Sequence, residues 1–264
     1  MSTFTDEGFL STSMDEWSRE CSGRYSEWFA LCREFNQYCV QLLRKLVPKN
    51  RQEHLAVALF IRLLSLFESS IILTERCMVN ETKIQLRAMM EALFTLKAIT
   101  IDETMAERYY DNNILEKLNN LRRYKRYGSD ALLKGLDLDK RIEELDGMKR
   151  QKSIMPLTTE TLAKKAGLPD FYVSAYPVLS WTAHSNVIDI GQYIHGKSDE
   201  EIEEVSWHPQ MEGIDKLLLT AMECAIIGLR SVNELFSLGV AGEIEKYFQR
   251  YHELAKKLTT NEID

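Results

Sequence analysis

Glycine and proline are scarce in this sequence. Only 12 glycines and five prolines occur among 264 residues, whereas β-rich folds need such residues at their many tight turns. No segment shows a sustained alternation of apolar and polar residues bounded by turn residues, which is the pattern of a strand in a sheet. These absences favour long helices joined by short loops. We therefore predict no sheet of three or more strands.

The short motifs of several enzyme classes are also missing. The chain has no G-x-x-x-x-G-K-[ST], G-x-G-x-x-G, G-x-S-x-G or H-E-x-x-H. It therefore lacks the motifs by which P-loop and Rossmann proteins bind nucleotides, serine hydrolases position their nucleophile and zincins bind zinc. Its five cysteines form no C-x-x-C pair, and we expect reduced, mostly buried thiols. The spacing of His184, His195 and His208, with Asp189 nearby, matches no metal site. We therefore expect no metal and no cofactor.

The charge balance and the N-terminus bear on where the protein works. A formal net charge of −7 and a pI near 5.4 are not those of a chain that wraps nucleic acid by electrostatics alone. The first 15 residues are acidic and do not look like a signal peptide. Residues 55–73 approach membrane-spanning length, but Arg62 and Glu68 interrupt them. We expect a buried central helix, a cytoplasmic protein and no membrane association.

Apolar residues recur at three- and four-residue steps along most of the chain, which predicts an all-α multi-helix bundle with long antiparallel helices. We expect one domain over residues 1–264. The expected helices cover residues 14–46, 51–78, 82–99, 102–127, 138–150, 177–193, 211–238 and 242–258. Pro177 is expected in the first turn of its helix. Residues 128–169 predict a less ordered helical insertion, a lid or subdomain, and the acidic run 199–204 predicts a solvated turn.

Arg87 and Glu91 lie four residues apart in an apolar helix, so their side chains share one face. Burying such a pair costs on the order of several kcal/mol of desolvation, unless hydrogen bonds and opposite charges compensate both groups. The pair is therefore either a structural lock between helices or part of a functional site. The sequence leaves both interpretations open.

Tyr176, Ser180 and His184 follow one another at four-residue steps and form a polar stripe. Histidine suits proton transfer near neutral pH, and a neighbouring Tyr or Ser would orient a substrate or a water molecule. A core histidine with satisfied hydrogen bonds is the alternative. We expect this stripe to meet Arg87 and Glu91.

A second charged stripe is formed by Glu223, Arg230 and Glu234, which lie near one face of the long late helix. If it faces the first stripe, the bundle encloses a polar centre, as ligand-binding bundles do.

A basic cluster lies near the end of the helix predicted over 102–127, where cations interleave with two tyrosines. Such a cluster is able to contact phosphates and stack bases. Cations at a helix C-terminus are also favoured by the helix dipole alone. The basic residues are Arg122, Arg123, Lys125 and Arg126.

Several short motifs resemble a family of uncharacterised bacterial helical proteins that share a domain of unknown function. The motifs are Arg87-Ala88-Met89-Met90-Glu91, then Ala106-Glu107-Arg108-Tyr109-Tyr110-Asp111 with Glu116-Lys117-Leu118, and Tyr176-x-x-Leu179-Ser180-x-x-x-His184-Ser185. The resemblance implies an all-helical domain in which arginine, glutamate and histidine cluster in space. The residues that carry this cluster here are Arg87, Glu91, Arg108, Asp111, Tyr176 and His184.

The layout is also loosely similar to HEPN-type ribonuclease domains, which use an Arg and a His a few residues apart on one helix. This sequence lacks that spacing. Two functions remain open. The first is a non-catalytic binding or assembly module, within a bacterial phage-defence or toxin-type system, that engages a partner protein or a second copy of itself. The second is an enzyme that processes RNA or a nucleotide through Arg87, Glu91 and His184, with Arg108, Asp111, Tyr176 and Ser180 binding the ligand.

Overall fold

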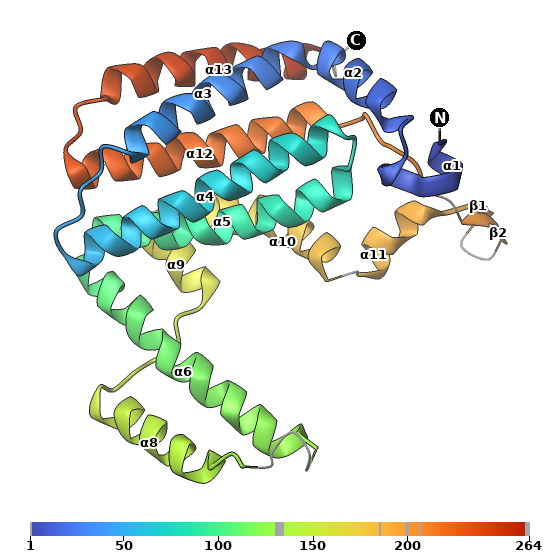
Figure 1. Ribbon diagram of the computed structural model, residues 1–264. Coiled ribbons are helices and arrows are strands. Elements are labelled where there is room, and N and C mark those ends of the chain that lie inside the picture. Colours follow the sequence, from blue (N-terminus) through green and yellow to red (C-terminus); the bar gives the residue numbers. More distant parts are fainter. Residues whose placement is uncertain (1, 130–134, 185, 199–200, 206, 262–264) are drawn as a thin grey trace.

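Long helices form the molecule (Figure 1), and a computed structural model describes residues 2–129, 135–184, 186–198, 201–205 and 207–261. The first half contains α1 (Phe4–Glu7), η1 (Gly8–Leu10), α2 (Met14–Arg24), α3 (Ser26–Leu43), α4 (Arg51–Glu75), α5 (Val79–Ile101) and α6 (Glu103–Tyr127). The second half contains α8 (Leu138–Gln151), α9 (Thr159–Lys165), α10 (Pro169–Ala183), α11 (Val187–Ile190), η2 (Gly191–Tyr193), β1 (Ile194–Ser198), β2 (Glu201–Val205), α12 (Ile214–Phe236) and α13 (Ala241–Asn261). The all-α prediction is confirmed.

Local capping explains where the central helices begin and end. The Asn50 side chain accepts a hydrogen bond from the Glu53 N–H at the start of α4, and Asp102 accepts one from the Thr104 N–H at the start of α6. Gly128 follows the last residue of α6, as its sequence position predicts. Each cap satisfies a backbone group that the first helical turn leaves without a partner.

The core lies where α4, α5 and α12 pack together, with α3 and α13 covering one side. Phe60, Phe67 and Phe94 are fully buried there. Gly228 marks the closest approach of α12 to α4, because a Cβ at this position would lie 2.2 Å from Leu63 Cδ2. The core therefore joins segments from both ends of the chain.

Helix α4 is long and apolar enough to cross a membrane by length and composition. In the structure, 44% of its most apolar 18-residue window is buried inside the bundle. Central helices of large protein cores meet the same criterion.

Helices α6 and α8 form a projection from the bundle, which we call the α6–α8 arm (Figure 1). Three ion pairs join α6 to α8 or to Lys152, the residue that follows α8. They are Arg122–Asp146 at 2.5 Å, Lys152–Asp111 at 2.6 Å and Lys125–Asp139. Helix α9 instead packs on α5, with Leu162 and Ala163 buried. The insertion expected over 128–169 therefore divides between arm and bundle. Its lower order stays a prediction, and its residues 130–134 lie outside the described residues.

Two local expectations are wrong. Pro177 lies inside α10, and it is Pro169 that occupies the first turn. Pro177 has no N–H to donate to the carbonyl of Val173, and Val173 is 68% exposed, so water reaches this side of the helix. Of the acidic run 199–204 that was expected to form a turn, residues 201–204 belong to strand β2, which pairs antiparallel with β1, and residues 199–200 lie outside the described residues. Within the described ranges this two-stranded hairpin is the whole of the β-structure.

Candidate functional site

A polar cluster joins α5 to α10 at the seam between the two helices. The Tyr176 hydroxyl donates to Glu91 Oε1 at 2.6 Å, and Arg87 Nη2 lies 3.1 Å from the same carboxylate oxygen. Glu91 therefore receives both a neutral and a charged donor. We call Arg87, Glu91, Tyr176 and Ser180 the Arg87 cluster.

The guanidinium of Arg87 is held on several sides. Its Nε donates to Ser180 Oγ at 3.1 Å, and its Nη2 donates to the Tyr176 hydroxyl at 3.2 Å. The guanidinium carbon also lies 5.3 Å from the centre of the Tyr176 ring, within the range of a cation–π contact. Ser180 in turn donates to the Tyr176 carbonyl at 2.8 Å. The side chains of α10 thus fix the orientation of Arg87.

The Arg87 cluster lies at the edge of the core and is partly open to water. The Arg87 side chain is 23% exposed and the Glu91 side chain 38%. Burial, followed by the hydrogen bond to Glu91, raises the pKa of Tyr176, so this hydroxyl remains a neutral donor near pH 7. The expected meeting of Arg87 and Glu91 with Tyr176 and Ser180 is confirmed. Its expected place inside a polar centre of the bundle is wrong.

His184 does not join this cluster. Helix α10 ends at Ala183, and His184 follows with non-helical backbone angles of φ −106° and ψ 11°. The four-residue step from Ser180 therefore no longer keeps the side chain on the same face. His184 is exposed, and its ring forms no hydrogen bond or ion pair with any described residue. The expected convergence of His184 with the cluster is wrong.

The α6 residues that the resemblance places in the cluster also lie elsewhere. Asp111 forms an ion pair with Lys152, at the base of the arm. Arg108 is exposed and contacts Met105 Sδ at 3.7 Å. Helix α6 leaves the bundle after α5, which carries both residues away from Arg87. The spatial cluster implied for Arg108 and Asp111 is therefore wrong.

The charged stripe of α12 faces α13 rather than α5. Arg230 lies 4.2 Å from the centre of the Phe248 ring and 3.5 Å from Glu245. Tyr251 of α13 lies near Glu223 and acts to lower the pKa of its carboxyl, and Glu234 is exposed. The face of α12 that meets α4 and α5 is made of apolar and small side chains. The expected polar centre is thus wrong, because α13 covers the charged side of α12.

The basic cluster on the arm is half neutralised. Arg122 and Lys125 are paired with the carboxylates of Asp146 and Asp139 on α8. Arg123 and Arg126 are exposed, and no ion pair links either to a described carboxylate. Arg126 instead lies over the neighbouring Tyr127 ring at 5.1 Å. Within the described part of the chain, Arg123 and Arg126 are thus the two of these four cations that have no carboxylate partner.

Cysteine chemistry and metal binding add no second centre. All five cysteines are free and buried, as expected. Burial raises the pKa of the Cys32 thiol to about 12, which keeps it protonated. Among the described residues, no group of three or more His, Cys, Asp or Glu side chains lies close enough to hold a metal ion.

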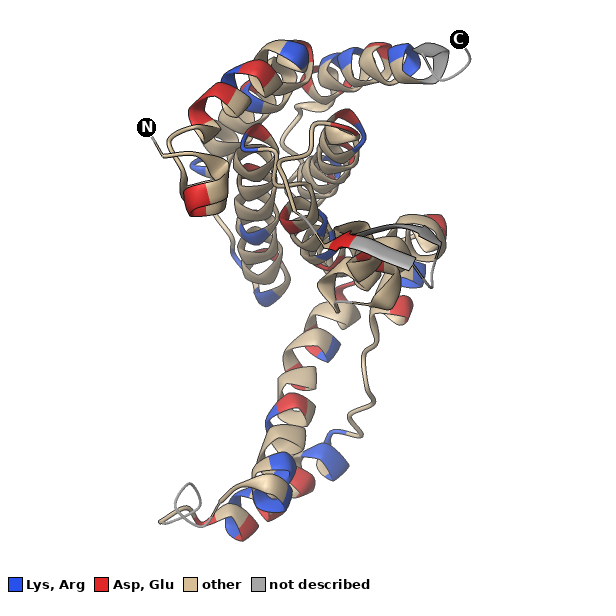
Figure 2. Cartoon of the chain, turned by 90° about the vertical axis from the view of Figure 1, so that its right-hand side faces the viewer, with Lys and Arg blue, Asp and Glu red and all other residues tan. Residues whose placement is uncertain are grey.

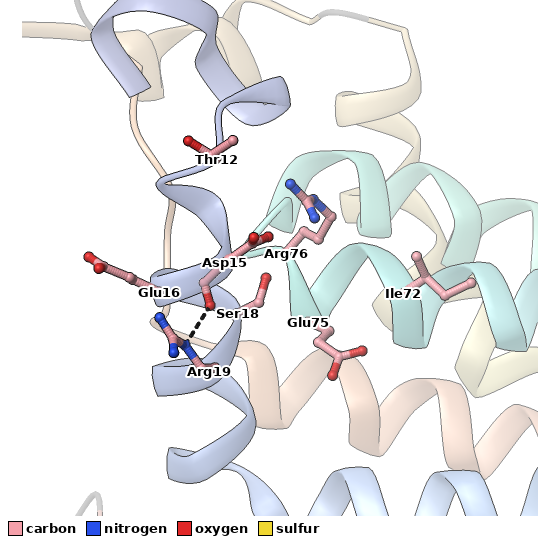
Figure 3. Close-up of a pocket in the computed structure, with 8 residues that line it drawn as sticks. All are labelled: Thr12, Asp15, Glu16, Ser18, Arg19, Ile72, Glu75 and Arg76. Carbon is pink, nitrogen blue, oxygen red and sulfur yellow. Dashed lines mark hydrogen bonds between the residues drawn. The ribbon is translucent and has the colours of Figure 1, made fainter. Parts of the chain in front are cut away.

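A hollow of about 500 Å³ lies between α2 and the end of α4, and the sequence patterns did not indicate it (Figure 3). The Asp15 carboxylate faces Arg76 across it. Several of its charges have partners, because Glu75 accepts from Arg33 at 2.6 Å, Arg76 donates to the Phe9 carbonyl at 3.1 Å and Arg19 donates to the Asp15 carbonyl at 3.2 Å. Internal pairing on this scale is typical of a junction between segments rather than of a ligand site.

The segment that contains both the Arg87 cluster and the arm also defines the family. The chain belongs to a family of unknown function, DUF5677, whose pattern matches residues 53–202. No curated protein and no solved structure matches the chain. The resemblance to an uncharacterised helical domain is thereby confirmed. The match runs from α4 into β2 and leaves α12 and α13, which complete the core, outside it.

Proposed function

We propose that this protein is a non-catalytic binding or assembly module. The observation that carries this proposal is the engagement of Arg87 by Ser180, Tyr176 and Glu91 together. An arginine that stabilises a reacting phosphate needs donors free to contact it, and a general base must lie within hydrogen-bond reach of the reacting group. His184, the histidine that was expected in this site, lies outside the network. The Arg87 cluster therefore acts as a lock that fixes α10 on α5.

The α6–α8 arm is the surface that we assign to the partner. A projection of this kind leaves most of its surface available, and we assign this surface to contacts with another molecule. Tyr124 is 51% exposed and Tyr127 is 74% exposed near its tip. Exposed tyrosines are enriched where proteins bind one another, because a rigid ring offers a large contact area with a polar end.

The charge pattern of the arm favours a protein partner over nucleic acid. Both acidic and basic residues occur along α6 and α8 (Figure 2), and three of the cations are paired with carboxylates. A hollow of about 360 Å³ between α6 and α8 mixes Lys117 and Arg141 with Leu121, Leu145 and Glu144. A phosphate backbone would instead be matched by a continuous basic stripe.

The partner test uses the arm tyrosines. Tagged full-length chain is cross-linked in host cells, and captured proteins are compared with those of a Tyr124→Ser, Tyr127→Ser double variant. We expect a defined partner with the wild type and its loss with the double variant. Tyr110→Ser is the matched control, because this ring is 50% exposed on the part of α6 near the bundle. Equal loss with Tyr110→Ser would contradict the assignment of the arm.

The ribonuclease alternative is tested separately. Purified chain is incubated with labelled single-stranded RNA, beside Arg87→Ala and His184→Ala. We expect no cleavage by any of the three. Cleavage by the wild type that both variants abolish would replace the proposed module with the enzyme.

The cellular setting that we propose is the cytoplasm of a bacterium, in a phage-defence or toxin-type system. Support for it comes from the resemblance of the Arg87 and Tyr176 helices to bacterial proteins. Plaque counts on cells with and without the gene test it, and equal counts for every phage and no effect on growth would contradict it.

A further inference from the structure

We propose that a groove at the junction of α5, α10 and α12 binds a small organic anion, and that Lys83 anchors its acidic group. The groove has a volume of about 830 Å³, within the roughly 300–1,000 Å³ range of small-molecule sites. It does not involve the α6–α8 arm or the engaged donors of Arg87. The inference is therefore independent of the proposed partner surface.

The groove combines apolar walls with a few polar groups. Val79, Val178, Leu179 and Leu217 supply apolar surface, which suits the body of an organic molecule. The charged groups of the lining are the ammonium groups of Lys83 and Lys216 and the carboxylate of Glu212, beside His208. Gln192 and Gln210 add side-chain amide groups. Lys83 is the cation through which this lining would hold an anionic group, and the amide N–H groups of Gln192 and Gln210 would add neutral donors.

Lys83 is held in place by a part-buried chain of hydrogen bonds. Its Nζ donates to Asn80 Oδ1 at 3.1 Å, and Asn80 Nδ2 donates to the Tyr193 hydroxyl at 2.9 Å. Asn80 is only 9% exposed, so its orientation is fixed by this chain. Lys83 itself is half-buried, and no carboxylate of the described residues lies within ion-pair distance of it. A half-buried ammonium that is oriented but not neutralised gains from an anion in the groove.

The position of Lys83 connects two hollows. It lines the groove and also an adjacent hollow of about 250 Å³, together with Val178 and Gln192. It also lies one helical turn before Arg87 on the face of α5 that meets α10. The groove thus lies at the open end of the polar seam between α5 and α10. Among the described residues, Lys83 is the cation of this seam that has no acidic partner.

The far wall of the groove is fixed before any ligand arrives. Residues 208–213 form this wall, and the Gln210 N–H donates to the Cys77 carbonyl at 3.2 Å. The Tyr25 hydroxyl donates to the Met211 carbonyl at 2.7 Å. Just before this segment, Trp207 packs against Phe4 with 4.9 Å between ring centres. A preformed wall lowers the entropic cost of binding.

The test measures thermal stabilisation of the full chain by defined probes. Adenosine 5′-monophosphate and citrate are titrated at constant ionic strength, with adenosine, inorganic phosphate and sodium chloride as references. We expect at least one of the two organic anions to raise the Tm in a saturable way. Hydrogen exchange should then slow in residues 79–83, 178–179 and 208–217, which line the groove, more than in the rest of the chain.

Two variants of Lys83 separate the proposal from general charge effects. Lys83→Met keeps the apolar stem and removes the charge, and we expect it to weaken binding at least about tenfold, as loss of a charge-assisted hydrogen bond does. Lys83→Gln should do the same and covers the case in which the Met variant fails to fold. Lys97→Met is the matched control, because Lys97 is half-buried on the same helix and lines neither hollow.

Three results would overturn the proposal. The first is that neither organic anion stabilises the chain beyond its references. The second is that inorganic phosphate stabilises it as much as adenosine 5′-monophosphate and citrate do, which would show an ion contact without an organic ligand. The third is that Lys83→Met and Lys97→Met bind the probe alike.

Discussion

Arginine is the residue that suits the seam between α5 and α10. Its planar guanidinium donates through Nε to Ser180 and through Nη2 to Tyr176 and Glu91, while its face lies against the Tyr176 ring. A lysine would offer a single ammonium group in place of the separate Nε and Nη2 donors. The partial exposure of the pair lowers the cost of desolvation, so the pair contributes stability without the penalty of a fully buried one.

Glu91→Ala tests the lock at the scale of single residues. Removing the carboxylate leaves the Arg87 charge half-buried and the Tyr176 hydroxyl without its acceptor. We expect a loss of about 1–2 kcal/mol in the free energy of unfolding, between the values for exposed and buried pairs. Urea unfolding measures it. His184→Ala, outside the network, should change the free energy by less than about 0.5 kcal/mol, and a larger effect of this variant than of Glu91→Ala would contradict the lock.

Glu223 predicts a dependence of stability on pH. Burial raises the pKa of this carboxyl, and the nearby Tyr251 only partly opposes it. The folded state therefore holds the proton more tightly than the unfolded state does. The stability from this effect is complete below the ordinary pKa of a glutamic acid and is lost as the pH rises through the raised value.

Glu223→Gln removes this titration. We expect its Tm to exceed that of the wild type by about 1–3 °C at pH 7 and to equal it near pH 4, where Glu223 is protonated. Thermal unfolding at the two pH values measures the difference. A gain of the same size at both pH values would assign the effect to packing instead of ionisation.

At the scale of elements, the described part of the α6–α8 arm has few buried apolar residues, and ion pairs link its two helices. Its buried residues include Leu115, Leu118 and Leu138. The pairs of α6 with Asp139 and Asp146 hold α8 along its whole length. Exposed pairs contribute only about 0.2–1 kcal/mol each, so the contact between the two helices is weak compared with the bundle.

Replacing Asp139 and Asp146 together by Ala tests this view of the arm. We expect amide exchange in residues 138–151 to become several-fold faster, because two pairs of about 0.2–1 kcal/mol each are lost. The Tm of the bundle should stay within about 1 °C of the wild type. Glu160→Ala, which removes the Lys164 pair on α9, is the control. Unchanged exchange in α8 would show that apolar contacts alone hold the arm.

At the scale of the whole molecule, the crossing of α4 with α12 joins the two ends of the chain. Gly228 permits this crossing, since its missing side chain leaves room for Leu63. Leu63 is fully buried and has little freedom to move away. The stability of the entire bundle therefore depends on one small residue in the helix that completes the core.

Gly228→Ala tests this dependence. We expect a loss of about 1–3 kcal/mol in the free energy of unfolding, the usual cost of an added methyl group in a filled core. Gly147→Ala is the matched control, because its Cβ would meet no atom within 4 Å. That substitution, inside α8, should stabilise its helix by about 0.5–1 kcal/mol. Equal effects of the two substitutions would contradict a tight crossing.

The sequence by itself determined the helices and the local part of the site. Apolar spacing is a local signal, and the helix expected over 102–127 lies at Glu103–Tyr127, with Asp102 as its cap and Gly128 after its last residue. The Arg87–Glu91 pair is local too, because a four-residue step in a helix always brings two side chains together. The family match covers residues 53–202, which include this pair.

Only the tertiary structure decided which faces meet and where helices leave the bundle. The end of α10 one residue before His184, and the contact of the charged face of α12 with α13, depend on packing between segments far apart in the chain. The groove at Lys83 is built the same way, with a wall held by Tyr25 and Cys77. Periodicity reports which side of a helix is buried, but not which neighbour buries it, so these features could not be predicted from the sequence.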